Sequence, residues 1–227
     1  LLQARLGLAS RDYGMTNAAL EELFATSKGL SNSTSAQAWM LKAKLFYFHT
    51  NPEEGMACLD SASTFIELEH SLLLEAEARG IRVELDFIAG DFRHAINYAD
   101  STLVAIKGEN EATFKEIKYR LLETSGRLAR GVIGIDEGHK RLSMALELAE
   151  SMPPYLRVRL LPSALSQLIY SSFEQSGEEV SDSIFTRLEK MIQPERYSHK
   201  AYLAEALTHR ARFFNTLGQF EQGISCA

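Results

Sequence analysis

The sequence predicts an all-α protein, a right-handed superhelix of about six antiparallel helix pairs. A pattern of aromatic-rich helix, short polar turn and a second helix opened by a small residue returns about every forty residues. The 227 residues include 5 Pro and 14 Gly, which is few for a chain with many β-turns, and apolar residues recur at helical spacing. A fixed period of this kind indicates stacked helical units, and we expect one domain over residues 1–227.

Each predicted pair has two positions where a small residue lets the helices approach closely. On the second helices these positions are Ala19, Gly55, Ala95, Gly138, Val180 and Gly223. Their counterparts on the first helices are Gly7, Ala43, Val83, Gly126, Leu168 and Ala211. Most of these residues are small, as close helix packing requires. Val180 and Leu168 depart from the pattern, which leaves the register of the fifth pair open.

The predicted turns carry the residues that end and begin helices. Asn51-Pro52 separates the helices of pair two, because Pro suits the first turn of a helix. Gly90-Asp91 supplies a Gly to end one helix and an Asp to cap the next. Asp136 is the predicted cap in pair four. The stretch 29–35 is the connection between pairs one and two, rich in Ser and Asn.

These motifs resemble the tetratricopeptide (TPR) family of helical repeats. Pair two carries Trp39, Ala43, Phe46, Gly55, Leu59 and Ala62 at that family's spacing, and pair six carries Ala211, Phe214, Gly218, Phe220 and Gly223. The family's usual period is about 34 residues. The spacings here are mostly longer, which resembles the elongated repeats of maltose-activator-type bacterial signalling regulators. The resemblance implies a TPR-like solenoid that acts as a protein-protein interaction scaffold.

In that family the first helices line a concave groove, one turn from the small packing residues. The resemblance therefore implies a partner-binding groove lined by Lys44, Tyr47, Glu84, Phe87, Arg120, Arg127, Arg130 and Arg212. Arg120, Arg127 and Arg130 share one helical face, and guanidinium groups bind carboxylates or phosphates in a bidentate manner. The hypothesis is that the groove binds a protein or peptide segment with acidic groups. The alternative is a solvated basic stripe that pairs with neighbouring Glu side chains.

The charge and the cysteines restrict the partners and the compartment. A net charge of −6 argues against strong nonspecific binding to nucleic acid or to an anionic membrane, so neither is an expected partner. No apolar run reaches the roughly 18 residues of a membrane span. Cys58 and Cys226 do not make a disulfide framework, which favours a reducing, cytoplasmic location. Cys58 is predicted to be a buried core thiol.

No motif for catalysis is found, and we expect neither a metal nor a cofactor. No two histidines lie three or four positions apart, so no helical pair can share a metal ion. The Gly-rich stretch 131–138 lacks the Lys-Ser/Thr ending of a phosphate loop. A non-catalytic scaffold is therefore the main prediction. One alternative is a sensor or regulatory repeat domain of a multidomain bacterial signalling or transcription regulator. The other is an enzyme on a helical toroid, which would require a cluster of acids or histidines.

The two ends of the chain suggest a piece of a longer protein. The sequence begins Leu1-Leu2 without Met and ends inside a predicted helix. We therefore expect an apolar surface at the C-terminal end, through which the chain could self-associate. Its predicted residues are Phe213, Phe214, Phe220 and Ile224.

Overall fold

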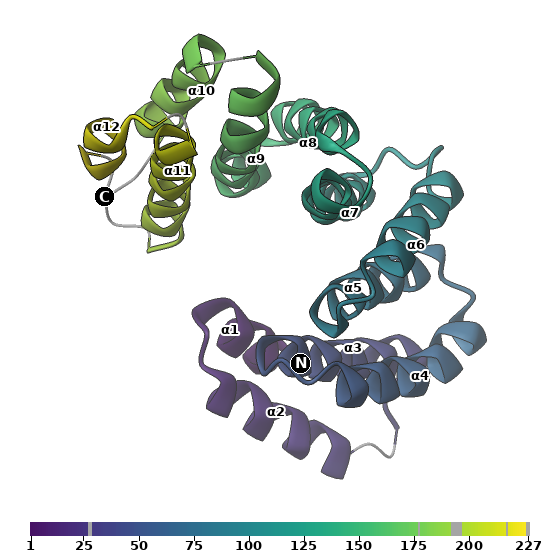
Figure 1. Cartoon of the computed structure of the whole chain (residues 1–227). Helices are drawn as coiled ribbons and strands as arrows, with labels where there is room; N and C mark the ends of the chain where they lie inside the picture. The colour runs from purple at the N-terminus through teal and green to yellow at the C-terminus, as the bar shows by residue number, and fades with distance from the viewer. Residues whose placement is uncertain (27–28, 177, 192–196, 217, 226–227) are drawn as a thin grey trace. The chain divides into compact units, whose positions relative to one another are not determined.

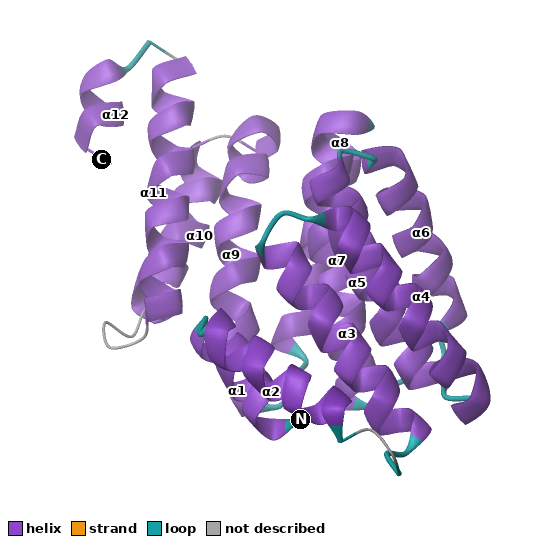
Figure 2. Cartoon of the chain, turned by 90° about the horizontal axis from the view of Figure 1, so that it is seen from below, coloured by secondary structure: helices purple, strands orange, loops and turns teal. Residues whose placement is uncertain are grey.

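The computed structural model describes residues 1–26, 29–176, 178–191, 197–216 and 218–225. In these ranges all regular secondary structure is helical, in twelve helices (Figures 1 and 2). The chain divides into two compact units, Leu1–Ile117 (unit 1) and Lys118–Ala227 (unit 2). The predicted single domain over residues 1–227 stays a prediction, and each unit is described by itself below.

Unit 1 consists of three helix pairs and the first residues of a seventh helix. The helices are α1 (Leu2–Ser10), α2 (Tyr13–Ala25), α3 (Asn32–Phe48), α4 (Pro52–Glu69), α5 (Leu72–Ala89) and α6 (Phe92–Ala105), followed by the start of α7 (Ala112–Val132). Within each pair the helices pack against each other, and α5 also packs against both α3 and α4 (Figure 1). Stacked pairs of this kind are the predicted repeat arrangement.

Capping residues in the sequence set where these helices begin. Asn51 accepts a hydrogen bond from the Glu54 backbone N–H, and Pro52 occupies the first turn of α4. Asp91 caps α6 in the same way, after Gly90 has ended α5 in the left-handed region at φ 83°. Both predicted turns are confirmed. Each cap satisfies a backbone donor that the helix itself leaves without a partner.

The core of unit 1 lies between α3, α4 and α5. Its buried residues include Ala43, Cys58, Leu59, Ala62 and Leu85. Trp39 and Phe46 are half-buried and pack against this cluster, as the repeat spacing predicts. Cys58 is a buried thiol, which confirms the prediction, and burial raises its pKa. The apolar face of each helix is therefore covered by its neighbours in the stack.

Unit 2 contains the rest of α7 and five further helices. These are α8 (Ile135–Glu150), α9 (Pro154–Ser176), α10 (Glu178–Met191), α11 (Tyr197–Thr216) and α12 (Phe220–Ser225). Helix α9 packs against α8, α10 and α11, and α12 packs against α11. Helices α7 and α8 approach very closely, since a Cβ atom on Gly138 would lie 2.6–2.8 Å from backbone and Cβ atoms of Arg130. Gly138 therefore serves the close packing that the sequence predicts.

The predicted register of the fifth pair is wrong by one residue. Val180 is 43% exposed, whereas the next residue, Ser181, is fully buried. The Ser181 hydroxyl donates a hydrogen bond to the Ile169 carbonyl oxygen at 3.1 Å, so Ser181 is the close-packing residue on α10. The predicted cap at Asp136 is also wrong. Helix α8 begins at Ile135 without a side-chain cap, and Asp136 lies in its first turn.

The predicted apolar surface at the C-terminal end is contradicted at Phe214. That side chain is only 4% exposed, because α11 buries it within unit 2. Ile224 is 73% exposed, and the side chains of Phe213 and Phe220 lie outside the described residues. Self-association through this end stays a prediction. Across the described ranges, no helix combines the length and the apolar character that crossing a membrane requires.

Candidate functional site

A half-buried carboxylate links α7 and α9 in unit 2. Glu123 on α7 accepts a hydrogen bond from the hydroxyl of Ser163 on α9, and its Oε1 lies 3.1 Å from the hydroxyl oxygen of Tyr119. Burial raises the pKa of Glu123, and this effect outweighs the hydrogen bond from Ser163 and the positive charge of Arg127, which both lower it. Glu123 therefore carries its negative charge less readily than an exposed Glu does.

A second carboxylate links α9 and α11. Glu205 on α11 accepts hydrogen bonds from Gln167 Nε2 at 2.9 Å and from Ser166 Oγ at 3.3 Å. His209, one turn further along α11, has its Nε2 at 3.9 Å from Glu205 Oε1. The first helices of the fourth, fifth and sixth pairs are thus joined by polar side chains, and these bonds fix how the three helices lie against one another.

Three of the predicted site residues act electrostatically on His209. Burial lowers the pKa of its imidazole, Glu205 opposes this effect, and the positive charges of Arg130, Arg212 and Arg127 lower the pKa further. Arg127 and Arg130 lie on α7 and Arg212 lies on α11, far away in the sequence. Folding has therefore brought these three guanidinium groups within electrostatic range of one ring.

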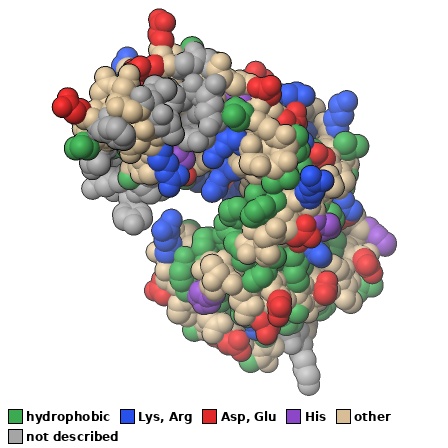
Figure 3. Space-filling model, in the orientation of Figure 1, with side chains coloured by type: hydrophobic (Ala, Val, Ile, Leu, Met, Phe, Trp, Pro, Cys, Tyr) green, Lys and Arg blue, Asp and Glu red, His purple; other side chains and the backbone are tan. Residues whose placement is uncertain are grey.

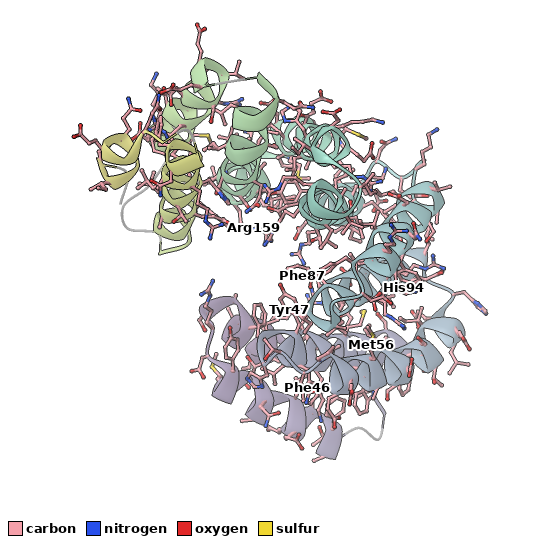
Figure 4. The ribbon with its side chains drawn as sticks, viewed as in Figure 1. Phe46, Tyr47, Met56, Phe87, His94 and Arg159 are labelled. Atoms are coloured by element: carbon pink, nitrogen blue, oxygen red, sulfur yellow. The ribbon has the colours of Figure 1, made fainter. Side chains whose placement is uncertain are left out.

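A fourth arginine belongs to the same neighbourhood and was missed by sequence reasoning. Tyr202 on α11 has a raised pKa, caused mainly by burial and then by Glu123, while the positive charge of Arg159 lowers it. Figure 4 shows Arg159 on α9, at the side of that helix where α7 and α11 lie. Figure 3 shows Lys and Arg side chains gathered along α9 and α11. We call Arg127, Arg130, Arg159 and Arg212 the basic face of unit 2.

Most guanidinium groups of the basic face are accessible to solvent. Arg127, Arg159 and Arg212 are exposed, and Arg130 is half-buried. Arg120, the remaining arginine predicted on α7, is half-buried and is not among the charges that act on His209. Burial raises the pKa of Glu123, and the positive charge of Arg127 opposes this effect. The arrangement suits an anionic group from solvent.

The other four predicted residues lie in unit 1. Lys44 and Tyr47 belong to α3, and Glu84 and Phe87 belong to α5, which packs against α3. All four are half-buried. Tyr47 packs against the core cluster and forms an edge contact with Phe48 at 5.2 Å between ring centroids. Figure 4 shows Tyr47 and Phe87 on the same side of unit 1, and Figure 3 shows hydrophobic side chains there.

The structure also bears on metal chemistry. No three His, Cys, Asp or Glu side chains come together in a way that could hold a metal ion, among the residues that the structure describes. The histidines near carboxylates instead take part in contacts between helices, such as His94 of α6 beside Asp86 of α5, or within one helix, such as His209 beside Glu205 on α11.

No protein-family model matches this sequence, and no curated protein matches it. Solved structures do match its fold. A Rap protein complexed with Competence and Sporulation Factor has a TM-score of 0.72 at 11% identity, over 99% of this chain and 71% of that one. The apo form of the quorum sensor NprR from B. thuringiensis has a TM-score of 0.68 at 15% identity, over 99% of this chain and 61% of the sensor.

A third similar structure carries the repeat type in its description. It is a putative kinesin light chain of Podospora anserina with nearly identical TPR-like repeats, with a TM-score of 0.60 at 9% identity over 84% of this chain and 90% of that one. The predicted fold class, an all-α solenoid of TPR-like helical repeats, is therefore confirmed. The narrower resemblance to maltose-activator-type repeats stays a prediction. At these identities the similarity concerns the fold.

Proposed function

We propose that this chain is a non-catalytic protein-interaction module, in which the basic face of unit 2 binds an acidic segment of a protein or peptide partner. The observation that carries the proposal is that the positive charges of Arg127 and Arg130 on α7 and of Arg212 on α11 all act on the His209 ring, while Arg127 and Arg212 are exposed. Two helices supply these groups, so an acidic segment lying across α7 and α11 would contact all three. Each guanidinium fork can bind a carboxylate in a bidentate manner.

The two half-buried acids explain how such a face would keep its geometry. Glu123 ties α7 to α9 through Ser163, and Glu205 ties α11 to α9 through Gln167. The helices that carry the arginines are thus held before a partner arrives, which lowers the entropy lost on binding. The same side chains leave the outer guanidinium groups Arg127 and Arg212 exposed.

A regulatory role is the second candidate. Similar folds occur in a Rap protein complexed with Competence and Sporulation Factor and in the quorum sensor NprR. As a regulator, the chain would change conformation when the segment binds, and a further domain would then contact a different surface of it. Small-angle scattering with and without a bound acidic peptide separates the two candidates. A change of the scattering curve supports regulation, and an unchanged curve supports a scaffold.

The binding test uses a fluorescein-labelled hexaglutamate peptide and measures anisotropy. The double variant Arg127→Gln/Arg212→Gln should bind at least about tenfold more weakly than the unaltered chain, because it lacks two bidentate donors. Arg157→Gln is the matched control, since Arg157 is an exposed arginine on α9 outside the basic face. Its affinity should equal that of the unaltered chain.

Two results would contradict the proposal. One is an equal loss of affinity in the control and in the double variant, which would indicate general charge attraction. The other is equal binding of a hexalysine peptide, which would show that the sign of the charge does not matter. Binding that weakens as salt is added, with the control unchanged, supports the proposal because exposed charges are screened.

A further inference from the structure

Unit 1 has a hollow between α4, α5 and the side of α6, apart from the basic face of unit 2. It is a cavity of about 600 Å³, within the range of small-molecule sites. Its lining includes Asp60, Ser63 and Glu67 on α4, Arg79 and Arg82 on α5, and Tyr98 on α6. Figure 4 shows His94, the neighbour of Tyr98 on α6, and Tyr47 on opposite sides of α5, so this cavity lies apart from the predicted groove residues of unit 1.

The two long walls of the cavity carry opposite charges. Asp60 and Glu67 lie two turns apart on one face of α4, and Arg79 and Arg82 lie one turn apart on one face of α5. Between them the floor is apolar, with Leu59 and Ile66. Within the described part of the chain, no ion pair joins the acids of α4 to the arginines of α5. On their own helix, Arg79 pairs with Glu75 and Arg82 with Asp86. An anionic group in the cavity would therefore share these guanidinium groups with their carboxylate partners.

The basic wall is held in place by its own contacts. The Arg79 guanidinium pairs with Glu75 at 2.8 Å and lies 5.5 Å from the ring of Tyr98. The other face of Tyr98 stacks on His94 at 5.6 Å. Residues on α5 and α6 therefore fix this side of the cavity before anything binds.

A buried acid anchors the same wall. Asp86 is 7% exposed, and its Oδ2 lies 2.7 Å from His94 Nδ1. Its Oδ1 lies 3.5 Å from the buried Nε of Arg82, an atom that makes no hydrogen bond in the structure. Arg82 is therefore oriented by charge while its hydrogen-bonding capacity is incompletely used. Because the Nε atom is buried, only the exposed outer part of the Arg82 guanidinium group can reach an occupant of the cavity.

We propose that this cavity binds a small zwitterionic molecule whose cationic and anionic ends are separated by an apolar body. The amine or guanidine end would face Asp60 and Glu67, and the carboxylate end would face Arg79 and Arg82. The apolar middle would cover Leu59 and Ile66. The site belongs to unit 1 and is independent of the basic face of unit 2.

The test uses ε-aminocaproate as the probe and follows backbone amide resonances of the whole chain by NMR. Caproate and hexylamine, which carry one charge each, are the matched ligands. Binding of ε-aminocaproate should shift amides around Ser63, Ser71 and Tyr98, and each singly charged ligand should bind at least about tenfold more weakly. Equal binding of all three, or no shift at millimolar concentration, would overturn the proposal.

Two variants keep the test independent of a folding defect. Glu67→Gln removes one acid of the cavity and should weaken ε-aminocaproate, whereas Glu69→Gln, an exposed position on the same helix outside the cavity, should not. Ser63→Phe places a large side chain on the wall and should abolish the shifts while leaving the helical circular dichroism unchanged. Binding that survives Ser63→Phe would place the ligand elsewhere and reject this site.

Discussion

Tyr119 on α7 and Leu160 on α9 are joined by a buried hydrogen bond, in which the tyrosine hydroxyl donates to the leucine carbonyl oxygen at 3.1 Å. The ring of Tyr119 is 1% exposed, and burial raises the pKa of its hydroxyl well above the usual range. The same hydroxyl lies 3.1 Å from Glu123. The buried Tyr119 hydroxyl thus links α7 and α9, the first helices of neighbouring repeats, and also lies beside Glu123.

Removal of this hydroxyl should destabilise unit 2 without reshaping it. We expect Tyr119→Phe to lower the free energy of unfolding by about 1 kcal/mol, the usual net contribution of one hydrogen bond. Urea unfolding followed by circular dichroism measures the change. Tyr155→Phe is the control, since Tyr155 is 70% exposed on α9 and its change should be near zero. Equal effects of the two substitutions would show that the buried bond does not contribute.

The close approach of α7 and α8 at Gly138 yields a second prediction. A Cβ atom there would lie 2.6–2.8 Å from Arg130 atoms, two of them in the backbone, so a change of side-chain rotamer cannot relieve the clash. Gly138→Ala should therefore destabilise the chain by about 1–3 kcal/mol, as overpacking typically does. Thermal unfolding of the purified variant gives the comparison.

A glycine in the partner helix provides the control for this substitution. Gly131 on α7 has open space around the position of a Cβ atom. Gly131→Ala should raise stability by up to about 1 kcal/mol, because alanine loses less backbone entropy in a helix. Opposite signs for the two substitutions support the close-packing role of Gly138. A gain of stability in Gly138→Ala would contradict it.

The parts of the fold that the sequence predicts correctly are those that depend on local signals. The boundaries at Asn51-Pro52 and Gly90-Asp91 follow from capping and from the left-handed region, which depend on a few neighbouring residues. The register of α10 fails because Ser181, a polar residue, takes the close-packing position through a bond to Ile169 on α9. Repeat spacing alone does not encode a contact that depends on the partner helix.

The sequence predicts the basic face only in part, because local spacing sets which residues share one helix face but does not set which helices come together. Arg127 and Arg130 share a face of α7 by spacing, so the sequence shows their proximity. The approach of Arg212, and the position of Arg159 in the same neighbourhood, depend on how α9 and α11 pack. The Ser and Gln residues at 163, 166 and 167, set among Leu160, Leu161, Ala164, Leu165 and Leu168, were the signal that a polar cluster lies between α9 and its neighbours.

The buried imidazole of His209 should make stability depend on pH. Its folded-state pKa lies below the ordinary value of 6.5, because of burial and of the nearby arginines, so the unfolded chain takes up the proton first. Stability should therefore fall as pH drops through 6.5 and level off below the folded-state pKa. Urea unfolding across this range measures the slope. His209→Gln should remove this component, and an unchanged slope in that variant would contradict the assignment.

Glu123 should contribute with the opposite sign. Its pKa is raised above 4.5 mainly by burial, so the folded state keeps its proton to higher pH than the unfolded state does. The stability from this group is fully present below pH 4.5 and is lost as pH rises through the folded-state pKa. Glu123→Gln retains an oxygen for Tyr119 and Ser163 but cannot ionise, so it should raise the melting temperature at neutral pH.

The pH dependence of that gain separates ionisation from packing. If the buried charge causes the cost, the stabilisation by Glu123→Gln should shrink as pH approaches 4.5, where the wild-type carboxyl is protonated as well. Melting temperatures of both chains across this range provide the measurement. Glu147→Gln, at an exposed carboxylate on α8, is the control and should show no such trend. A gain that stays constant with pH would assign the effect to packing and would remove Glu123 from the titrating groups of unit 2.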